Sequence, residues 1–160
     1  MRKILVAITG SDKRVSRTVE YCGKQFSGMS DLSLTLLHVL PNLPPSFWND
    51  GHILTKEERR ARQGVVDKWL ENQRLATEPM FQSAIEILTR EDIKPEQIET
   101  KIIYDSTDPA TSILEEAKDG GYLTLVLGRS HTSRVGELLL GSTTIKIIHR
   151  GAGLAICLVE

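Results

Sequence analysis

Five short apolar runs alternate with longer amphipathic segments, and this alternation constrains the fold more than any other feature of the chain. Each run is bounded by glycine, proline or polar turn residues, which is typical of strands buried in a sheet. Strands separated by helices predict a parallel α/β sheet with right-handed crossovers and helices on both faces, a Rossmann-like arrangement. The predicted strands span residues 4–8, 32–40, 98–104, 122–127 and 154–159.

The segments between the strands carry helix signals. Thr55 with Glu58 three residues later forms a capping box, and a helix is expected from there to about Ala76. Thr77 and Pro79 then predict either the start of another helix or a kink. Further helices are expected to begin near Ser11, Asp108 and Ser142.

The chain has the length and composition of one ordinary domain, expected to span residues 1–160. Hydrophobic residues make up 40% and the formal net charge is −1, which favours neither nucleic acid nor an anionic membrane as a partner. No apolar stretch is long enough for a signal peptide or a membrane span. The two cysteines, Cys22 and Cys157, lie far apart in the sequence, so we expect a cytoplasmic protein without a disulfide scaffold or a zinc site.

Most motifs of catalysis and phosphate binding are missing. The chain contains no GxxxxGK(S/T) loop, no GxGxxG and no GxSxG, and its four histidines lack the spacing of metal ligands. We find no nucleophile paired with a base, so the protein is not expected to be an enzyme, and any ATP hydrolysis would be slow or incidental. The loop at residues 41–54 contains Phe47 and Trp48, which either cover a crevice as a lid or pack on the domain.

One segment, residues 128–143, has the character of a ligand site. Gly128 ends a predicted strand and lets a ligand approach the backbone. Gly141, Ser142 and Thr143 stand at a predicted helix N-terminus, where free N–H groups and the helix dipole suit a phosphate. The alternative is that glycine and serine only cap the helix, and the spacing alone leaves both interpretations open.

Several stretches together resemble one family. MRKILVAITGS at residues 1–11 is similar to a first strand often written KILVPVDGS, and LTLLHVL at 34–40 is similar to the second strand of the same family. Residues 108–128 look like the helix and strand that precede its ligand loop, and residues 127–160 look like its C-terminal third. On these residues the chain resembles the universal stress protein family.

The resemblance implies a five-stranded parallel sheet of order 3-2-1-4-5 and a homodimer formed through the last strands, here 154–159. One branch of the family binds ATP, and the pattern of that branch is G-x2-G-x9-G-(S/T). Here Gly128, Gly141 and Ser142 keep that spacing, but His131 replaces the second glycine. Thr9 replaces the aspartate that holds the ribose, which exchanges a charged acceptor for a neutral one at a cost of about 1 kcal/mol.

Carried over position by position, the resemblance implies a nucleotide site at the carboxyl ends of the strands. Adenine is expected near Ala7, Ile8 and Val39, and the ribose near Thr9. The outer phosphates are expected at Gly141, Ser142 and Thr143. The residues expected to line the ribose and first phosphates are Leu127, Gly128, Arg129 and His131.

Three functions are compatible with these observations. The first is a regulatory or stress-response protein that binds ATP, or another adenine nucleotide, with or without Mg²⁺. The second is a family member that binds no nucleotide and acts as a dimeric interaction module, which Thr9 and His131 favour. The third is an enzyme of a related α/β family such as a nucleotidyl transferase, for which only Glu137 lies near Gly128 as an acidic residue.

Overall fold

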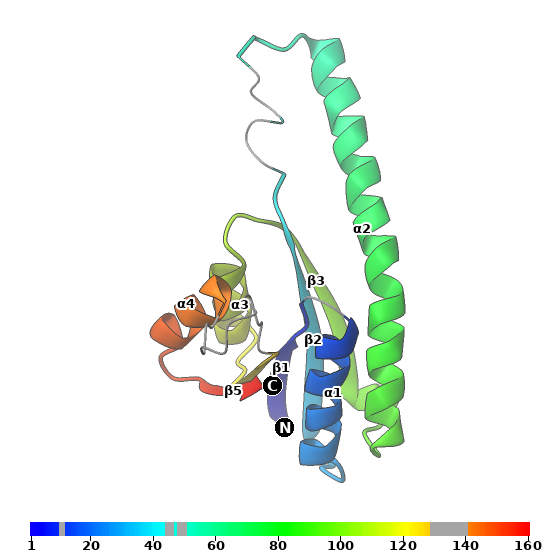
Figure 1. The fold of residues 1–160 in the computed structure, drawn as a ribbon, viewed down its shortest axis with the longest axis vertical. Coiled ribbons are helices and arrows are strands. Elements are labelled where there is room, and N and C mark those ends of the chain that lie inside the picture. Colours follow the sequence, from blue (N-terminus) through cyan, green and yellow to red (C-terminus); the bar gives the residue numbers. More distant parts are fainter. Residues whose placement is uncertain (10–11, 44–46, 48–50, 129–140) are drawn as a thin grey trace, which may run out of the picture.

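The computed structural model describes residues 1–9, 12–43, 47, 51–128 and 141–160. It contains a five-stranded parallel sheet of order β3-β2-β1-β4-β5, which confirms the predicted order (Figure 1). The strands are β1 (Arg2–Ala7), β2 (Leu32–Pro41), β3 (Ile98–Ser106), β4 (Thr124–Gly128) and β5 (Ala155–Val159). The helices are α1 (Asp12–Phe26), α2 (Lys56–Arg90), α3 (Pro109–Asp119) and α4 (Ser142–Arg150), with a short 3-10 turn, η2, at Pro95–Gln97.

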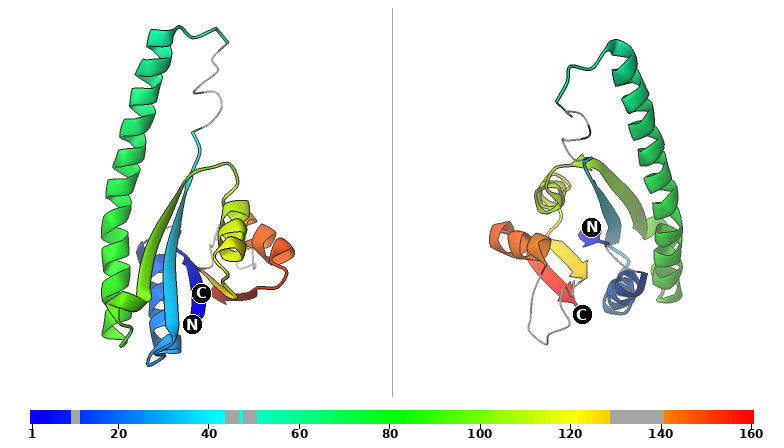
Figure 2. Two further views of the ribbon diagram at one scale, coloured as in Figure 1. Left: turned by 180° about the vertical axis from the view of Figure 1, so that it is seen from behind. Right: turned by 45° about the horizontal axis from the view of Figure 1, so that its top comes forward.

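The helices cover both faces of the sheet, as Figures 1 and 2 show: α1 and α2 lie on one face, and α3 and α4 on the other. The central strand β1 therefore has a buried side chain at every position of its second half. Ile4 and Val6 pack under α1 and α2, while Leu5 and Ala7 pack under α3 and α4. This burial on both faces explains why the first strand is a continuous apolar run rather than an alternating one.

The long helix α2 differs from one sequence prediction. Its capping box is formed as predicted, with Glu58 N–H donating to Thr55 Oγ at 3.2 Å. The helix then runs unbroken through Pro79 to Arg90, so the interpretation of two separate helices is wrong. Pro79 removes one backbone donor, but Phe81 and the rest of the buried face hold the helix together across it. The other buried positions of α2 are Thr77, Ala84 and Leu88.

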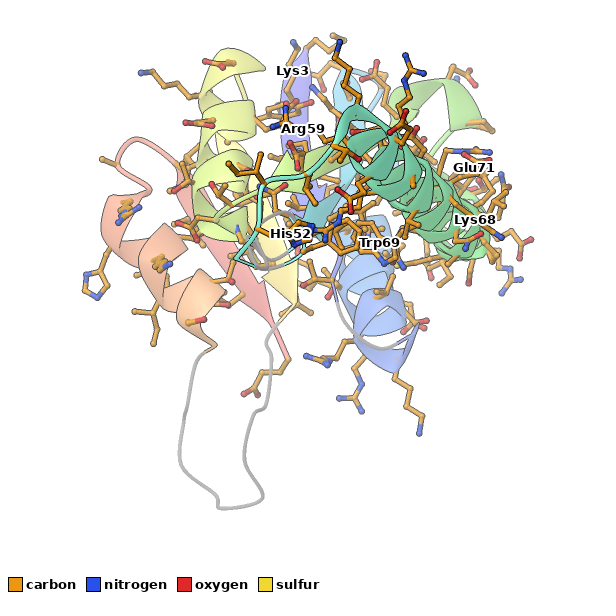
Figure 3. All side chains as sticks on the ribbon, turned by 90° about the horizontal axis from the view of Figure 1, so that it is seen from above. Lys3, His52, Arg59, Lys68, Trp69 and Glu71 are labelled. Atoms are coloured by element: carbon orange, nitrogen blue, oxygen red, sulfur yellow. The ribbon has the colours of Figure 1, made fainter. Side chains whose placement is uncertain are left out.

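Thirty-five residues give α2 a length of about 52 Å, more than the sheet can cover. Figure 1 shows its N-terminal half extending beyond the sheet. Phe47 contacts this half of the helix, because Arg62 Nη1 donates to the Phe47 carbonyl at 2.6 Å. In Figure 3, Trp69 and His52 lie on one side of α2, whereas Lys68 and Glu71 point away from that side.

The two cysteines approach the same core from distant parts of the sequence. Cys22 on α1 is buried, and Cys157 on β5 packs against the same cluster of side chains, yet both are free thiols. Burial raises the pKa of Cys22 to about 12, which keeps its thiol protonated and unreactive near neutral pH.

The last strand, β5, is an edge of the sheet, hydrogen-bonded to β4 on one side. Its four residues from Ile156 to Val159 are each half-buried. In the part of the chain that the structure describes, no helix has the length and apolar character needed to cross a membrane.

Candidate functional site

A cavity of about 430 Å³ opens at the carboxyl ends of β1 and β4. The sheet order reverses between these neighbouring strands. The chain first adds β2 and β3 on one side of β1, and then adds β4 and β5 on its other side. Open α/β sheets bind ligands at such a switch point. The lining residues are Ala7, Thr9, Arg14, Val39, Pro109, Ile113, Leu127, Gly128, Gly141, Ser142, Thr143, Thr144 and Ile147.

The strand ends form an apolar base for the cavity. Ala7 is paired in register with Leu127 of β4 on one side and with Leu37 of β2 on the other. Val39 comes from β2, two residues beyond that pairing. Thr9 follows β1 and is exposed at the rim, where its hydroxyl is the first polar side chain after the strand. The base of the cavity therefore suits a flat apolar ring, and the Thr9 hydroxyl at the rim can form a hydrogen bond with a ligand.

Gly128 lies at the end of β4, where it packs closely against α1. A Cβ placed on Gly128 would come within 2.6 Å of Thr18 Oγ. Thr18 in turn donates to the Arg14 carbonyl at 2.9 Å, which fixes its hydroxyl at that point of α1. The missing side chain thus lets a helix approach the strand, a role that the sequence analysis assigned to a ligand.

The N-terminus of α4 faces the same cavity. Gly141 is the N-cap residue, with φ −60° and ψ 152°, and no side chain among the described residues caps this helix. Ser142 is the first residue inside the helix and so does not act as its cap. The amide groups of the first turn, from Ser142 to Thr144, have no acceptor within the helix and are available to an anion.

Three helices contribute lining residues that the sequence analysis missed. Arg14 comes from the first turn of α1, Pro109 and Ile113 come from α3, and Thr144 and Ile147 come from α4. One signal could have identified Arg14 and Pro109: in a parallel sheet, the first turn of a helix that follows a strand lies at the carboxyl edge. Ile113 and Ile147 are buried core residues whose side chains also reach the cavity, and no sequence pattern distinguishes them from other core positions.

Of the eleven residues predicted for the site, eight line the cavity. Ile8 does not line it, because its side chain is buried beneath α1 and α2 and its N–H donates to the Leu37 carbonyl at 2.9 Å. Arg129 and His131 lie outside the described residues. The eight that line the cavity are Ala7, Thr9, Val39, Leu127, Gly128, Gly141, Ser142 and Thr143.

Asp108, immediately before α3, connects the two helices on this side of the cavity. Its carboxylate accepts from Thr111 Oγ at 2.8 Å and from Lys146 Nζ of α4 at 3.1 Å, and Arg150 lies 3.9 Å away. The Thr111 hydroxyl, followed by Lys146, holds the pKa of Asp108 below its ordinary value. The carboxylate therefore joins α4 to α3 instead of capping the α3 backbone.

A second cavity of about 420 Å³ lies at the opposite edge of the sheet, lined in part by Leu114, Leu123 and Leu154. Lys118 and Gly121 border it at the C-terminal end of α3, and Arg150 and Gly151 border it at that of α4. Helix C-termini carry partial negative charge and disfavour anions. The carboxyl-edge cavity, with helix N-termini around it, is therefore the candidate for a phosphorylated ligand.

The fold is shared with solved structures. A universal stress protein from Archaeoglobus fulgidus has a TM-score of 0.69 at 16% identity, with 100% of this chain and 99% of that chain covered. A structure of the universal stress protein from the same organism in complex with dAMP has a TM-score of 0.64 at 14% identity, covering 100% and 98%. A universal stress protein in complex with cAMP has a TM-score of 0.61 at 16% identity, covering 99% and 96%.

The sequence itself matches a family model. No match was found among curated proteins. The model of the universal stress protein family, in contrast, matches residues 1–152, which include every described element except β5. The chain therefore belongs to the universal stress protein family.

Proposed function

We propose that this protein binds an adenine nucleotide, ATP or a close relative, in the carboxyl-edge cavity and acts as a regulatory protein without catalytic activity. The observation that carries the proposal is the N-terminus of α4, left uncapped by any described side chain and facing a cavity at the switch point of the sheet. Free amides and a positive helix dipole in such a place suit a phosphate group.

The cavity accommodates the parts of a nucleotide in order. The adenine ring would lie against Ala7 and Val39, the ribose near Thr9, and the phosphates at Gly141, Ser142 and Thr143. A volume of about 430 Å³ is in the usual range for small-ligand sites. The complexes of two structural relatives with dAMP and cAMP support an adenine nucleotide as the ligand class.

The chemistry of the lining supports binding rather than catalysis. Among the described lining residues there is no carboxylate, histidine or cysteine to act as base or nucleophile. Mg²⁺ prefers oxygen ligands and often reaches nucleotide sites through the phosphates. Here the metal would be held by the phosphates, water and the hydroxyls of Ser142 and Thr143, and ATP hydrolysis would be slow.

We also propose that the protein is a homodimer through residues 154–159. β5 is an apolar edge strand, and an unpaired edge of this kind tends to pair with another strand. A dimer would also serve the alternative function, an interaction module that binds no nucleotide. Sedimentation at micromolar concentration tests the proposal: a monomer there would contradict it.

The nucleotide proposal is tested by isothermal titration of MgATP into the wild type and two variants at the α4 N-cap. Gly141→Asp places a carboxylate at the phosphate end of the cavity, while Gly141→Asn is its neutral match. Both residues are favourable N-caps, so each variant should melt at or above the wild-type temperature. We expect the aspartate to weaken ATP binding by on the order of 100-fold and the asparagine far less.

Two results would contradict the nucleotide proposal. One is the absence of heat and of thermal stabilisation by MgATP in the folded wild type. The other is equal ATP affinity in Gly141→Asp and the wild type, which would place the nucleotide elsewhere.

A further inference from the structure

The pairing of β5 with β4 determines which of its backbone groups face outward from the sheet. The Ala155 N–H donates to the Leu123 carbonyl at 2.9 Å, so Ala155 turns its backbone groups toward β4. Successive residues of a strand turn their N–H and C=O groups to opposite sides. Ile156 and Leu158 therefore turn theirs away from β4, where the described part of the chain has no further strand (Figure 2).

The side chains of β5 also alternate between the two faces of the sheet. Cys157 and Val159 pack against the core under α1 and α2, whereas Ile156 and Leu158 pack against the core under α3 and α4. A second copy that continues the sheet through β5 must keep each core on its own face. The two antiparallel copies of β5 are then related by a two-fold axis perpendicular to the sheet.

Such an axis allows only registers in which one residue lies opposite its own copy. Residues directly opposite each other in an antiparallel pair point to the same face, and two successive residues of β5 point to different faces. Cys157 is the middle residue of Ala155–Val159. An axis at Cys157 pairs the whole strand, whereas an axis one residue away pairs only 155–157 or 157–159.

At the register centred on Cys157, the two copies of this residue form a non-hydrogen-bonded pair, because the backbone groups of each copy point toward its own β4. The Cα atoms of such a pair lie about 4.5 Å apart. Disulfides form when the Cα atoms are about 4.4–6.8 Å apart, so the two thiols can bond without movement of the backbone. Ile156 and Leu158 of the second copy would exchange hydrogen bonds on either side.

From this geometry we propose that Cys157 is a redox modification site, at which the thiols of two copies form a disulfide across the paired β5 strands. The inference rests on the homodimer proposed above. The oxidant is a peroxide: one thiolate attacks a peroxide oxygen and becomes a sulfenic acid, and the second thiolate then displaces hydroxide from that sulfur. Two thiols and one hydrogen peroxide thus give one disulfide and two waters.

The surroundings of the two cysteines favour Cys157 for this chemistry. Cys157 is half-buried and forms a hydrogen bond with the side chain of Tyr21, which is 36% exposed. Its thiol therefore lies near the surface, within reach of a small oxidant. Cys22 is fully buried, and burial raises its pKa to about 12, so little of the reactive thiolate forms there.

The disulfide is tested by treating the 160-residue chain with hydrogen peroxide and separating the products by denaturing electrophoresis without reductant. The wild type should give a band at twice the chain mass of 17.9 kDa, and dithiothreitol should remove that band. Cys157→Ser should lose the band, whereas Cys22→Ser should keep it. Peptide mass spectrometry of the wild-type band identifies the bonded cysteines without any substitution.

A displaced thiol tests the register. Combining Cys157→Ser with Ala155→Cys keeps a thiol on the same face of β5, at a position that is exposed. Residue 155 lies opposite residue 159 of the second copy, so the two thiols are about 13 Å apart along the strands, too far for a disulfide. This double variant should sediment as a dimer and give no covalent band.

Sedimentation of the reduced protein separates failure of this inference from failure of the homodimer. A reduced wild type that sediments as a dimer but gives no covalent band in peroxide would overturn the disulfide and leave the homodimer intact. A monomer would contradict the homodimer and the disulfide together. A band that persists in Cys157→Ser, equal crosslinking in the double variant, or a bond between Cys22 and Cys157 would overturn the assignment.

Discussion

The two cavities at opposite edges of the sheet are almost equal in volume, about 430 and 420 Å³, yet they suit different ligands. The carboxyl-edge cavity is lined by the first turns of α1, α3 and α4, whereas the amino-edge cavity runs along α3 from Thr111 and reaches the C-terminal ends of α3 and α4. Because every crossover in a parallel sheet returns its helix in the opposite direction, helix N-termini gather at one edge and C-termini at the other. The volume of a cavity therefore does not indicate which of the two binds a phosphorylated ligand, whereas the direction of the surrounding helices does.

The difference between the two cavities can be tested by placing one carboxylate in each. Leu123→Asp introduces it at the amino edge, where Leu123 is 73% exposed and the change should be tolerated. We expect unchanged ATP affinity in this variant, against a loss on the order of 100-fold in Gly141→Asp. Calorimetric titration of both variants measures the difference, and a larger loss in Leu123→Asp would move the nucleotide to the amino edge.

A second prediction concerns the glycine that borders the amino-edge cavity. A Cβ on Gly151 would lie 2.7 Å from the Ile147 carbonyl and 2.8 Å from Ile156 Cδ1. The carbonyl belongs to the backbone of α4 and cannot move aside, so Gly151→Ala should lower the free energy of unfolding by about 2–3 kcal/mol. Urea denaturation measures this. Nucleotide affinity in the folded variant should stay within twofold of the wild type, and a selective loss of affinity would argue against the separation of the two cavities.

The corresponding glycine at the carboxyl edge should be less sensitive. In Gly128→Ala the new methyl group meets Thr18 Oγ, the end of a side chain that can rotate at the loss of its bond to the Arg14 carbonyl. We expect a loss of about 1 kcal/mol in the free energy of unfolding. Combining it with Thr18→Ala should restore most of the loss. An equally unstable double variant would mean that Gly128 is required for a reason other than the contact with Thr18.

The smallest expected effect is a pH dependence at Asp108. The folded pKa of this carboxyl lies below its ordinary value of 3.8, so its contribution to stability is present above that pH and is lost as the pH falls through the folded pKa. Asp108→Asn should therefore be less stable than the wild type near neutral pH, and the difference should shrink below about pH 4. Urea unfolding at a series of pH values measures it, and a constant difference would show that Lys146 and Thr111 do not favour the charged form.

The sequence predicted the architecture well, for a definite physical reason. A parallel sheet buried on both faces requires strands that are continuous apolar runs. The crossover helices require one apolar face to pack on the sheet. Strands and helices therefore each leave a local pattern in the sequence. Of the two predictions at Pro79, the separate helix was wrong, because the local tendency of proline to end a helix was outweighed by the burial of Phe81 and its neighbours. Residues far apart in the sequence supply that packing, and no local pattern reports it.

For the candidate site, most residues at strand ends were predicted, whereas the residues contributed by α1, by α3 and by the interior of α4 were missed. Ala7 and Thr9 follow from the end of the first strand, but the side chain of Ile8 is turned to the other face by the alternation of the strand. Arg14 and Pro109 could have been added from their places in the first turns of helices that follow strands, but Ile113 and Ile147 were recognised only from the packing of α3 and α4.

The order of strands and helices, and the glycine and hydroxyl residues at the start of α4, could be recognised from the amino-acid sequence alone. Three features instead became visible from the packing of the elements: Gly128 accommodates Thr18, the two cysteines share one core, and Arg14 lines the carboxyl-edge cavity. The reason is that strands and helices leave local patterns in the sequence, such as apolar runs and capping residues. Contacts between elements instead depend on the packing of whole helices against the sheet.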